Sequence, residues 1–486
     1  MEEGWGEGGR KMKNKTEFEY RGRWWVPEKP DKKFSGVLRY SQLDGASLEI
    51  EKYNIDFTEL KETFDKKKEK KLKILLGETI DGKKITLLNC FETSTTMNLP
   101  KIKRSIFFVD KILIGHHFEK ISDIKFKKIL VHFTNLDEWV NIHGFKIKFS
   151  GKKKIKFHID YKIPSIIKTK INKDFALRIV FEVSGPSSSM VQKEACIKQN
   201  IFIEIKHQKE EKNLEDFLKI IRILQDFLTF AIQTAVYPDI LKGYTQSNKI
   251  EIGDKTILNP IEIINTSQII DLKHKQILPF QMFFSFRDIY PEFKKVIKKW
   301  FRLYELLETV LQLYFAQFYN PKLYPEYNFL SLVYAIEGYH RARNKGEYIS
   351  DMKYGNIQDL LIKAIPSTLE NDFQEALKQK LKYGNEYSLR KRLKEIISVL
   401  SEFKTKIIQN ENGFISKVVD TRNYLVHQDK SLEKNAAKGN ELYFLTLQIR
   451  LVFEIFLLKE LGLDSNKINS LISQRLSRYN FGSELK

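Results

Sequence analysis

The sequence predicts an α+β chain in which a β-rich region comes first and an all-α helical bundle follows. Up to about residue 264, apolar residues come in short alternating runs bounded by Gly, Pro and Asp, which is typical of antiparallel strands. From Pro291 onward they recur every three or four positions over long stretches, which is the spacing of amphipathic helices. Pro279 and Pro291 flank a poorly patterned link, so we place a domain boundary near residue 290.

The first third of the chain is expected to be a β-rich domain over residues 16–150. Residues 1–15 are rich in glycine and charge, so we expect them to be disordered. Trp24 and Trp25 are expected to pack in the core and at the rim of a sheet rather than to stack on nucleic-acid bases. The expected strands lie at 18–20, 24–26, 36–40, 47–50, 74–76, 85–88, 107–109, 112–114 and 126–133. A short helical turn is expected at 136–139.

A β-rich continuation with one long helix is expected over residues 151–290. Basic and apolar residues alternate at 155–159, which gives one basic sheet face that could bind RNA or simply be solvated. A wide apolar stripe predicts a helix over 214–236, which ends at Tyr237-Pro238. Strands are expected again at 249–252 and 261–264.

Helices are expected throughout residues 291–470, and residues 471–486 are expected to be a loose tail. Apolar stripes at helical spacing predict helices at 300–314, 328–344, 373–383, 388–407, 414–427 and 441–461. The last of these is expected to end at Gly462, a residue suited to a left-handed C-cap. Residues 351–370 show no regular pattern.

The residues that could carry chemistry stand late in the chain, in the helix expected after Gly413. An apolar stripe leads into this stretch and consists of Phe414, Ile415, Val418 and Val419. Continuing the stripe reaches Arg422 and Val426, so a charge stands where the pattern asks for an apolar side chain. Arg422 is therefore either salt-bridged inside the bundle or placed at a cleft or subunit seam, where it can bind a phosphate.

The candidate catalytic residues are Arg422, Asn423 and His427. A guanidinium stabilises charge on a phosphate, and an imidazole moves a proton near neutral pH, so an Arg and a His held together can cut RNA without a metal. His427 follows Arg422 by five positions, roughly 140° around a helix. We therefore expect a distorted helix or a second copy to complete the site. A His near a helix C-terminus is favoured in its charged form, which suits a proton donor.

Other helices could supply supporting residues. Glu337 and His340 lie on the apolar stripe of the helix expected at 328–344. Glu337 can pair with Arg422, either to fix the bundle or to orient Arg422 behind the reacting centre. His340 is a second proton-transfer group or, as we favour, a hydrogen-bonded core residue. A basic run on the helix expected at 388–407 gives an RNA-binding face or a solvated one, and it consists of Arg390, Lys391, Arg392 and Lys394.

Charge and cysteine content narrow the class of protein. The 486 residues carry a formal net charge of +21, which favours a polyanionic partner such as nucleic acid. Cys90 and Cys196 are the two cysteines, too few for a thiolate zinc site or a disulfide scaffold, which fits a cytoplasmic protein.

The pair His116-His117 is an incomplete ligand set, so we expect no metal and no cofactor. The start of the chain has no signal pattern and no apolar run could span a bilayer, so no membrane partner is expected.

Three stretches carry a resemblance to a known family. They are Gly22-Arg23-Trp24-Trp25-Val26-Pro27, Ala335-Ile336-Glu337-Gly338-Tyr339-His340-Arg341 and Thr421-Arg422-Asn423-Tyr424-Leu425-Val426-His427. An Arg, a polar residue, a short apolar run and a His resemble the signature of HEPN domains, helical bundles that are often metal-independent ribonucleases. Together the three stretches resemble ApeA-type anti-phage proteins. The resemblance implies a HEPN helical bundle over 291–470, behind a domain like the ApeA N-terminal domain over 16–150.

The resemblance also implies a function. It implies a metal-independent endoribonuclease of abortive-infection defence, which cleaves RNA, with tRNA as a candidate, by 2′-hydroxyl attack to leave a 2′,3′-cyclic phosphate. It implies a homodimer or higher homo-oligomer through the HEPN domain, an N-terminal sensor or regulator, and a phage-derived activator. The alternative is a non-catalytic helical module that binds RNA or protein, in which Arg422 and His427 are structural. A DNA-binding regulator is a third reading, which no helix-turn-helix or zinc pattern supports.

Overall fold

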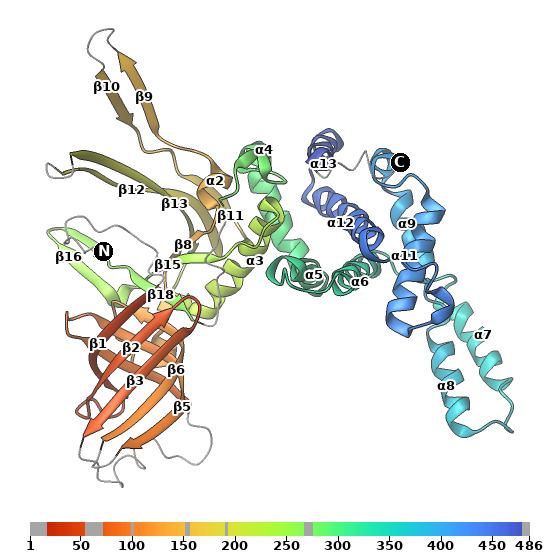
Figure 1. The fold of residues 1–486 in the computed structure, drawn as a ribbon, viewed down its shortest axis with the longest axis horizontal. Coiled ribbons are helices and arrows are strands. Elements are labelled where there is room, and N and C mark those ends of the chain that lie inside the picture. Colours follow the sequence, from red (N-terminus) through yellow and green to blue (C-terminus); the bar gives the residue numbers. More distant parts are fainter. Residues whose placement is uncertain are drawn as a thin grey trace. The chain divides into compact units, whose positions relative to one another are not determined.

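A computed structural model describes residues 17–53, 71–98, 102–150, 156–189, 193–266 and 276–478 of the chain (Figure 1). The chain divides into two compact units between Lys294 and Lys295. The first unit is β-rich and the second is helical, which confirms the predicted α+β class. The segment expected to be disordered, residues 1–15, lies outside the described residues.

The first six strands form a closed antiparallel barrel. Strand β1 pairs with both β2 and β4, β4 pairs with β5, β5 with β6, β6 with β3, and β3 with β2. The strands are β1 (Glu17–Trp25), β2 (Phe34–Ser41), β3 (Gly45–Tyr53), β4 (Lys71–Thr79), β5 (Lys84–Asn98) and β6 (Ile102–Ile114). Alternating side chains point into the barrel, because successive residues of a strand face opposite sides.

Trp24 lies at the centre of the barrel core and is fully buried, and Trp25 beside it is also buried. A Cβ atom on Gly77 would lie 2.2 Å from the Trp24 ring, so only glycine at this position lets the indole lie against strand β4. The prediction of Trp24 as a core residue is therefore confirmed.

The sheet continues beyond the barrel through β18, which pairs with the end of β6. Beyond β18 the strand order is β15, β8, β13, β12 and β11, so the expected division after residue 150 falls within one sheet. These strands are β8 (Lys128–Phe133), β11 (Ile167–Lys170), β12 (Phe175–Ser189), β13 (Glu194–His207), β15 (Pro238–Tyr244) and β18 (Ile261–Asn265). Helix α3 (Leu214–Ile232) packs on this part with a wide buried face, as the apolar stripe predicted.

Smaller elements complete the first unit. Three two-stranded pairs stand outside the main sheet: β9 (Phe145–Ser150) with β10 (Lys156–Tyr161), β7 (Lys125–Phe126) with β14 (Lys212–Asn213), and β16 (Lys249–Ile252) with β17 (Lys255–Leu258). Two short helices are α2 (Leu136–Val140) and α4 (Phe286–Ile289). Helix α2 confirms the helical turn expected at 136–139.

Helices make up the described part of the second unit, up to residue 478, apart from connecting loops and an isolated β-bridge between Glu347 and Glu386. The helices are α5 (Phe293–Tyr319, entering from the first unit), α6 (Pro325–Arg343), α7 (Asp351–Lys363), α8 (Asn371–Lys382), α9 (Leu389–Ser398), α10 (Lys404–Ile407), α11 (Glu411–His427), α12 (Gly439–Leu461) and α13 (Ser465–Arg478). Helices α6, α9 and α11 pack on one another, and α12 packs along α6. Helix α12 ends at Gly462 with φ 80°, as predicted.

Three expectations for the helical unit were wrong. Residues 351–363 form helix α7, although no residue of α7 or α8 is buried, so no core-facing stripe marks them in the sequence. The helix expected at 388–407 is broken after Ser398 and resumes as α10. Residues 471–478 of the expected tail are helical, because Leu471 and Ile472 on α13 are buried.

Candidate active site

Helix α11 carries the predicted catalytic motif at its C-terminal end. Its N-terminus is capped by Asn410, whose side chain accepts a hydrogen bond from the Gly413 N–H at 3.0 Å. Gln428 adopts a left-handed conformation with φ 52°, so His427 is the last helical residue. The buried residues of α11 are Phe414, Ile415, Val418 and Thr421.

Arg422 does not take the buried position that the sequence pattern assigned to it. Thr421 takes this position and is fully buried, whereas Arg422 beside it is half-buried and Val426 is exposed. The Thr421 hydroxyl accepts a hydrogen bond from the Ala437 N–H at 2.9 Å, so this position is filled by a polar group with a partner. Burial of Thr421 therefore places Arg422 at the edge of the packed face.

Arg422 and His427 meet on one helix, contrary to the expectation from helical angles. Nη1 of Arg422 lies 3.4 Å from Nε2 of His427 and donates to Oδ1 of Asn423 at 3.0 Å. The expectation considered only the angular positions of the two residues around the helix. The arginine side chain is long enough to reach around the end of α11. A guanidinium can donate to Nε2 when this nitrogen carries no proton.

The guanidinium of Arg422 is only partly satisfied. Its Nε is buried and has no hydrogen-bond partner in the part of the chain that the structure describes. Among the same residues, no carboxylate lies within ion-pair distance of Arg422. A buried donor without an acceptor costs about 1–3 kcal/mol and is uncommon in folded proteins. Arg422 thus keeps unused capacity to bind an anion, while Asn423 holds one of its nitrogens in place.

Glu337 does not pair with Arg422, so this predicted pairing is corrected. Its Oε1 accepts hydrogen bonds from Nε and Nη2 of Arg341, at 3.3 Å and 3.0 Å, one turn along α6. Arg341 also bonds Glu386, which ties α6 to the segment before α9. The nearby partner at i+4 outcompetes a partner on another helix, because the two side chains already share a helix face.

His340 and Arg392 form a buried pair between α6 and α9. Nε2 of His340 lies 3.0 Å from Oε2 of Glu395, and Nδ1 lies 3.0 Å from Nη1 of Arg392. Burial, together with the charge of Arg392, lowers the pKa of His340 despite the opposing effect of Glu395. His340 is thus a hydrogen-bonded core residue, as we favoured.

Arg392 is fully buried, so it cannot belong to an exposed RNA-binding face, and this prediction is corrected. Besides His340, its guanidinium donates to the carbonyl oxygens of Tyr387 and Gly346, at 3.1 Å and 3.5 Å. The burial of Arg392 could not be read from the basic run itself, because helix α9 turns position 392 toward the helices packed against it while positions 390 and 394 face solvent.

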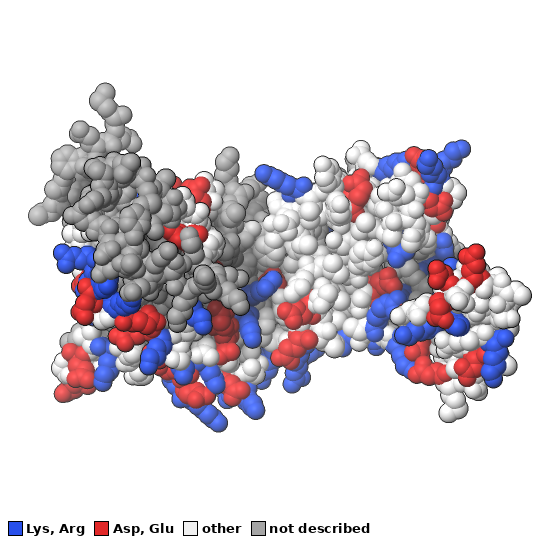
Figure 2. Space-filling view, turned by 90° about the horizontal axis from the view of Figure 1, so that it is seen from below, with Lys and Arg blue, Asp and Glu red and all other residues white. Residues whose placement is uncertain are grey.

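The other three residues of the basic run, Arg390, Lys391 and Lys394, differ in their carboxylate partners. Lys391 pairs with Glu395 at 3.2 Å. Arg390 is exposed, donates to the Ser416 hydroxyl on α11 at 2.9 Å and lies 3.9 Å from Asp420. Lys394 is exposed. On the face shown in Figure 2, basic and acidic side chains are interspersed over the described surface rather than separated into patches of one sign.

The segment after α11 brings further residues to the motif that the sequence analysis did not single out. Asp429 caps the short helix η6 (Lys430–Leu432), and its hydrogen bonds with Ser431 hold its pKa below the usual value, with the nearby His427 lowering it further. Nζ of Lys438 lies 5.2 Å from the Tyr424 ring. An Asp-x-Ser signal just after the motif could have predicted this cap.

The described residues contain no group of three or more His, Cys, Asp or Glu side chains placed to hold a metal ion. Within the described ranges, no helix is long and apolar enough to cross a membrane. Both residues of the His116-His117 pair contact neighbouring groups. Nε2 of His117 lies 2.8 Å from the Gly77 carbonyl oxygen and its ring meets Trp25 edge-on, and the His116 ring meets Phe118 edge-on.

Comparison with known families covers both units of the chain. Residues 19–300 match the family described as ApeA N-terminal domain 1, and residues 330–467 match the Apea-like HEPN family. No curated protein and no solved structure matches the chain. The first match spans more than half of the chain, and the second contains Arg422, Asn423 and His427. The chain therefore belongs to the ApeA N-terminal domain 1 family and carries an Apea-like HEPN domain in its C-terminal part.

Proposed function

We propose that this protein is a metal-independent endoribonuclease of ApeA-type anti-phage defence that cleaves RNA in the cytoplasm. The HEPN domain implies a ribonuclease in a defence protein. The observation that carries the residue assignment is the contact between Arg422 and His427 at the exposed end of α11, where Arg422 has no carboxylate partner among the described residues. The buried structural Arg392, by contrast, uses its guanidinium on His340 and two carbonyl oxygens, whereas Nε of Arg422 has no acceptor among the described residues.

The proposed reaction follows from these two side chains. Nε2 of the neutral His427 accepts the proton of an RNA 2′-hydroxyl, the 2′-oxygen bonds to the adjacent phosphorus, and the bond to the 5′-oxygen breaks. The leaving oxygen takes a proton from water or from the imidazolium of a second copy. Arg422 stabilises charge on the phosphoryl oxygens, and Asn423 holds the guanidinium. The products are a 2′,3′-cyclic phosphate end and a 5′-hydroxyl end, and DNA is no substrate because it lacks the 2′-hydroxyl.

The assembly and the control of the enzyme are also part of the proposal. The motif is exposed, so two copies of the HEPN domain can face each other across a shared cleft in a homodimer or a higher oligomer. The β-rich unit would act as the sensor or regulator that responds to a phage-derived activator, because uncontrolled RNA cleavage would kill the cell. Arg390 and Lys394 remain as candidates for phosphate contacts, with host tRNA as a candidate substrate.

Cleavage of total bacterial RNA in EDTA tests the proposal. Wild-type protein, with and without phage lysate, is compared with His427→Ala and Arg422→Ala, and the ends of the products are mapped. His158→Ala, which removes an exposed histidine of β10, is the matched control. We expect cyclic-phosphate ends from the wild type and the control and none from the two motif variants. Equal cleavage by all four proteins would show that the assignment of Arg422 and His427 is wrong. No cleavage by any of them, with or without phage lysate, would instead support a non-catalytic module whose Arg422 and His427 are structural.

A further inference from the structure

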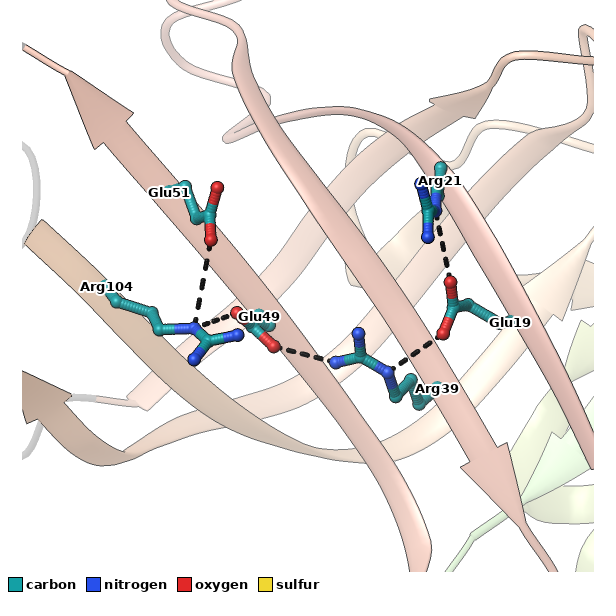
Figure 3. A network of polar contacts seen from close by, with 6 residues as sticks. All are labelled: Glu19, Arg21, Arg39, Glu49, Glu51 and Arg104. Carbon is teal, nitrogen blue, oxygen red and sulfur yellow. Dashed lines mark hydrogen bonds and ion pairs between the residues drawn. The ribbon is translucent and has the colours of Figure 1, made fainter. Parts of the chain in front are cut away.

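The outer face of the barrel carries a ladder of alternating charges across four strands (Figure 3). The antiparallel register places outward-facing residues of β1, β2, β3 and β6 side by side. The ladder begins with Arg21 and Glu19 on β1 and continues through Arg39 on β2 and Glu49 on β3 to Arg104 on β6. Arg104 also lies near Glu51 on β3, which is the last member of the ladder. Each carboxylate except the last joins two guanidinium groups.

Glu49 is the centre of the ladder, and it is buried although it points out of the barrel. One carboxylate oxygen accepts from Nη1 of Arg39 at 2.7 Å, and the other accepts from Nε of Arg104. Burial alone would raise the pKa of Glu49, but the two guanidinium groups hold it below the usual value. Glu49 therefore stays ionised and fixes both arginines in position.

A hollow of about 720 Å³ opens beside the ladder. Its lining includes the small residues Gly22, Ser35 and Gly36. Gly22 and Gly36 stand opposite each other on β1 and β2, where a Cβ would lie 2.3 Å from the Glu78 carbonyl oxygen and 2.5 Å from that of Glu49. Close approach of the strands thus requires glycine at both positions, which share the barrel-facing side of β1 and β2 with Trp24, so only their backbone lines the hollow.

Four arginines and three glutamates line this hollow. Arg23 has no ion-pair partner among the described residues, although it faces the same side of β1 as Arg21. Arg104 contacts its carboxylates through Nε, so its two terminal nitrogens stay available. Arg39 uses Nε and Nη1 and keeps Nη2. The hollow therefore contains several unused guanidinium donors, two of them on side chains that Glu49 holds in place.

We propose that this hollow is a binding site for a small molecule that carries a phosphate monoester. Guanidinium forks match the geometry of phosphate oxygens, and a fork that is already held by a carboxylate loses little freedom on binding. Arg23, Arg39 and Arg104 bind the phosphate, and Glu51 and Glu78 accept hydrogen bonds from hydroxyl or amino groups of the rest of the molecule. The volume lies within the range of small-ligand sites.

The acidic lining argues against a nucleic-acid strand at this site. Three glutamates among four arginines leave little net positive charge, whereas a polyanion is bound by an excess of Lys and Arg. A purely structural ladder would pair every arginine of this surface, whereas Arg23 has no ion-pair partner among the described residues. The site is separate from the Arg422 motif, so it stands whether or not the protein cleaves RNA.

Isothermal titration of the full-length protein with inorganic phosphate and with adenosine 5′-monophosphate tests this site. Arg23→Gln is the main variant, because Arg23 has no described ion pair and its loss leaves the ladder intact. We expect it to weaken nucleotide binding by about tenfold or more, which is the effect of one charge-assisted hydrogen bond. Its thermal melting without ligand should match that of the wild type. Arg104→Lys, which keeps the charge and removes the fork, should weaken binding as well.

Arg178→Gln is the matched control. Arg178 pairs with the buried Glu204, which also binds Lys128, so it repeats the ladder arrangement on another part of the sheet and does not line the hollow. If adenosine 5′-monophosphate binds and inorganic phosphate does not, the site contacts the whole nucleotide. If both probes bind with equal affinity, the site recognises the phosphate group only. Equal affinity in the wild type and Arg23→Gln, or no binding of either probe, would overturn the proposal.

Discussion

Replacing Arg422 by methionine separates the contribution of this side chain to activity from its contribution to stability. Methionine keeps the unbranched apolar stem and nearly the same helix propensity as arginine. It removes two hydrogen bonds, to Asn423 at 3.0 Å and to His427 at 3.4 Å. It also removes the buried Nε that has no acceptor among the described residues.

The expected change in stability is the sum of these effects. Each lost hydrogen bond contributes about 0.5–1.5 kcal/mol, and the unsatisfied Nε costs about 1–3 kcal/mol in the wild type. The terms nearly cancel, so the free energy of unfolding should change by less than about 1 kcal/mol. Cleavage should fall much further, because one preorganised donor contributes about 2.7–4 kcal/mol to transition-state stabilisation, or about 10²–10³ in rate.

Urea denaturation and single-turnover RNA cleavage measure the two quantities on the same preparation. Arg341→Met is the matched control, because Arg341 pairs with Glu337 and Glu386 in the same helical unit. It should lose about 1 kcal/mol of stability, in keeping with partly exposed ion pairs, and keep its cleavage rate. If Arg422→Met instead lowers the free energy of unfolding by more than about 2 kcal/mol, Arg422 has a structural partner and our reasoning about its free capacity is wrong.

Three further predictions concern other titratable side chains. His427→Asn should abolish RNA cleavage with an unchanged melting temperature, and a lower melting temperature would point to a structural role. Burial disfavours the His132 imidazolium, but its hydrogen bonds with Asp137 and Asp239 raise its pKa from 6.5 to about 10. This stabilisation is complete below pH 6.5 and is lost at about 1.4 kcal/mol per pH unit as pH rises toward 10. Urea unfolding at pH 6 to 9 should show the slope in the wild type and not in His132→Gln. Glu454→Gln should cost about 3–5 kcal/mol in denaturant unfolding of the helical unit, because it removes the buried carboxylate that pairs with Arg450 of the same helix and with Arg475 of α13, and an unchanged midpoint would contradict this.

The local elements of this protein could largely be predicted from the sequence. Helices α3 and α12 were found from their apolar stripes, and Gly462 was identified as a helix end, because periodicity and caps depend on neighbours along the chain. Closure of the barrel was not predicted, because the pairing of β1 with β4 joins residues far apart in sequence. Helix α7 was missed for a related reason, since an exposed helix has no core-facing stripe.

At the candidate site the sequence by itself supplied the residue types and only the tertiary structure decided their roles. Arg422, Asn423 and His427 were recognised by their chemistry and spacing, and they remain the candidates. Burial of Arg392 and the contact of Glu337 with Arg341 depend on which helices pack together and on which way each side chain turns. Which carboxylate pairs with a given arginine depends on distances in the folded chain, and these cannot be read from the order of residues.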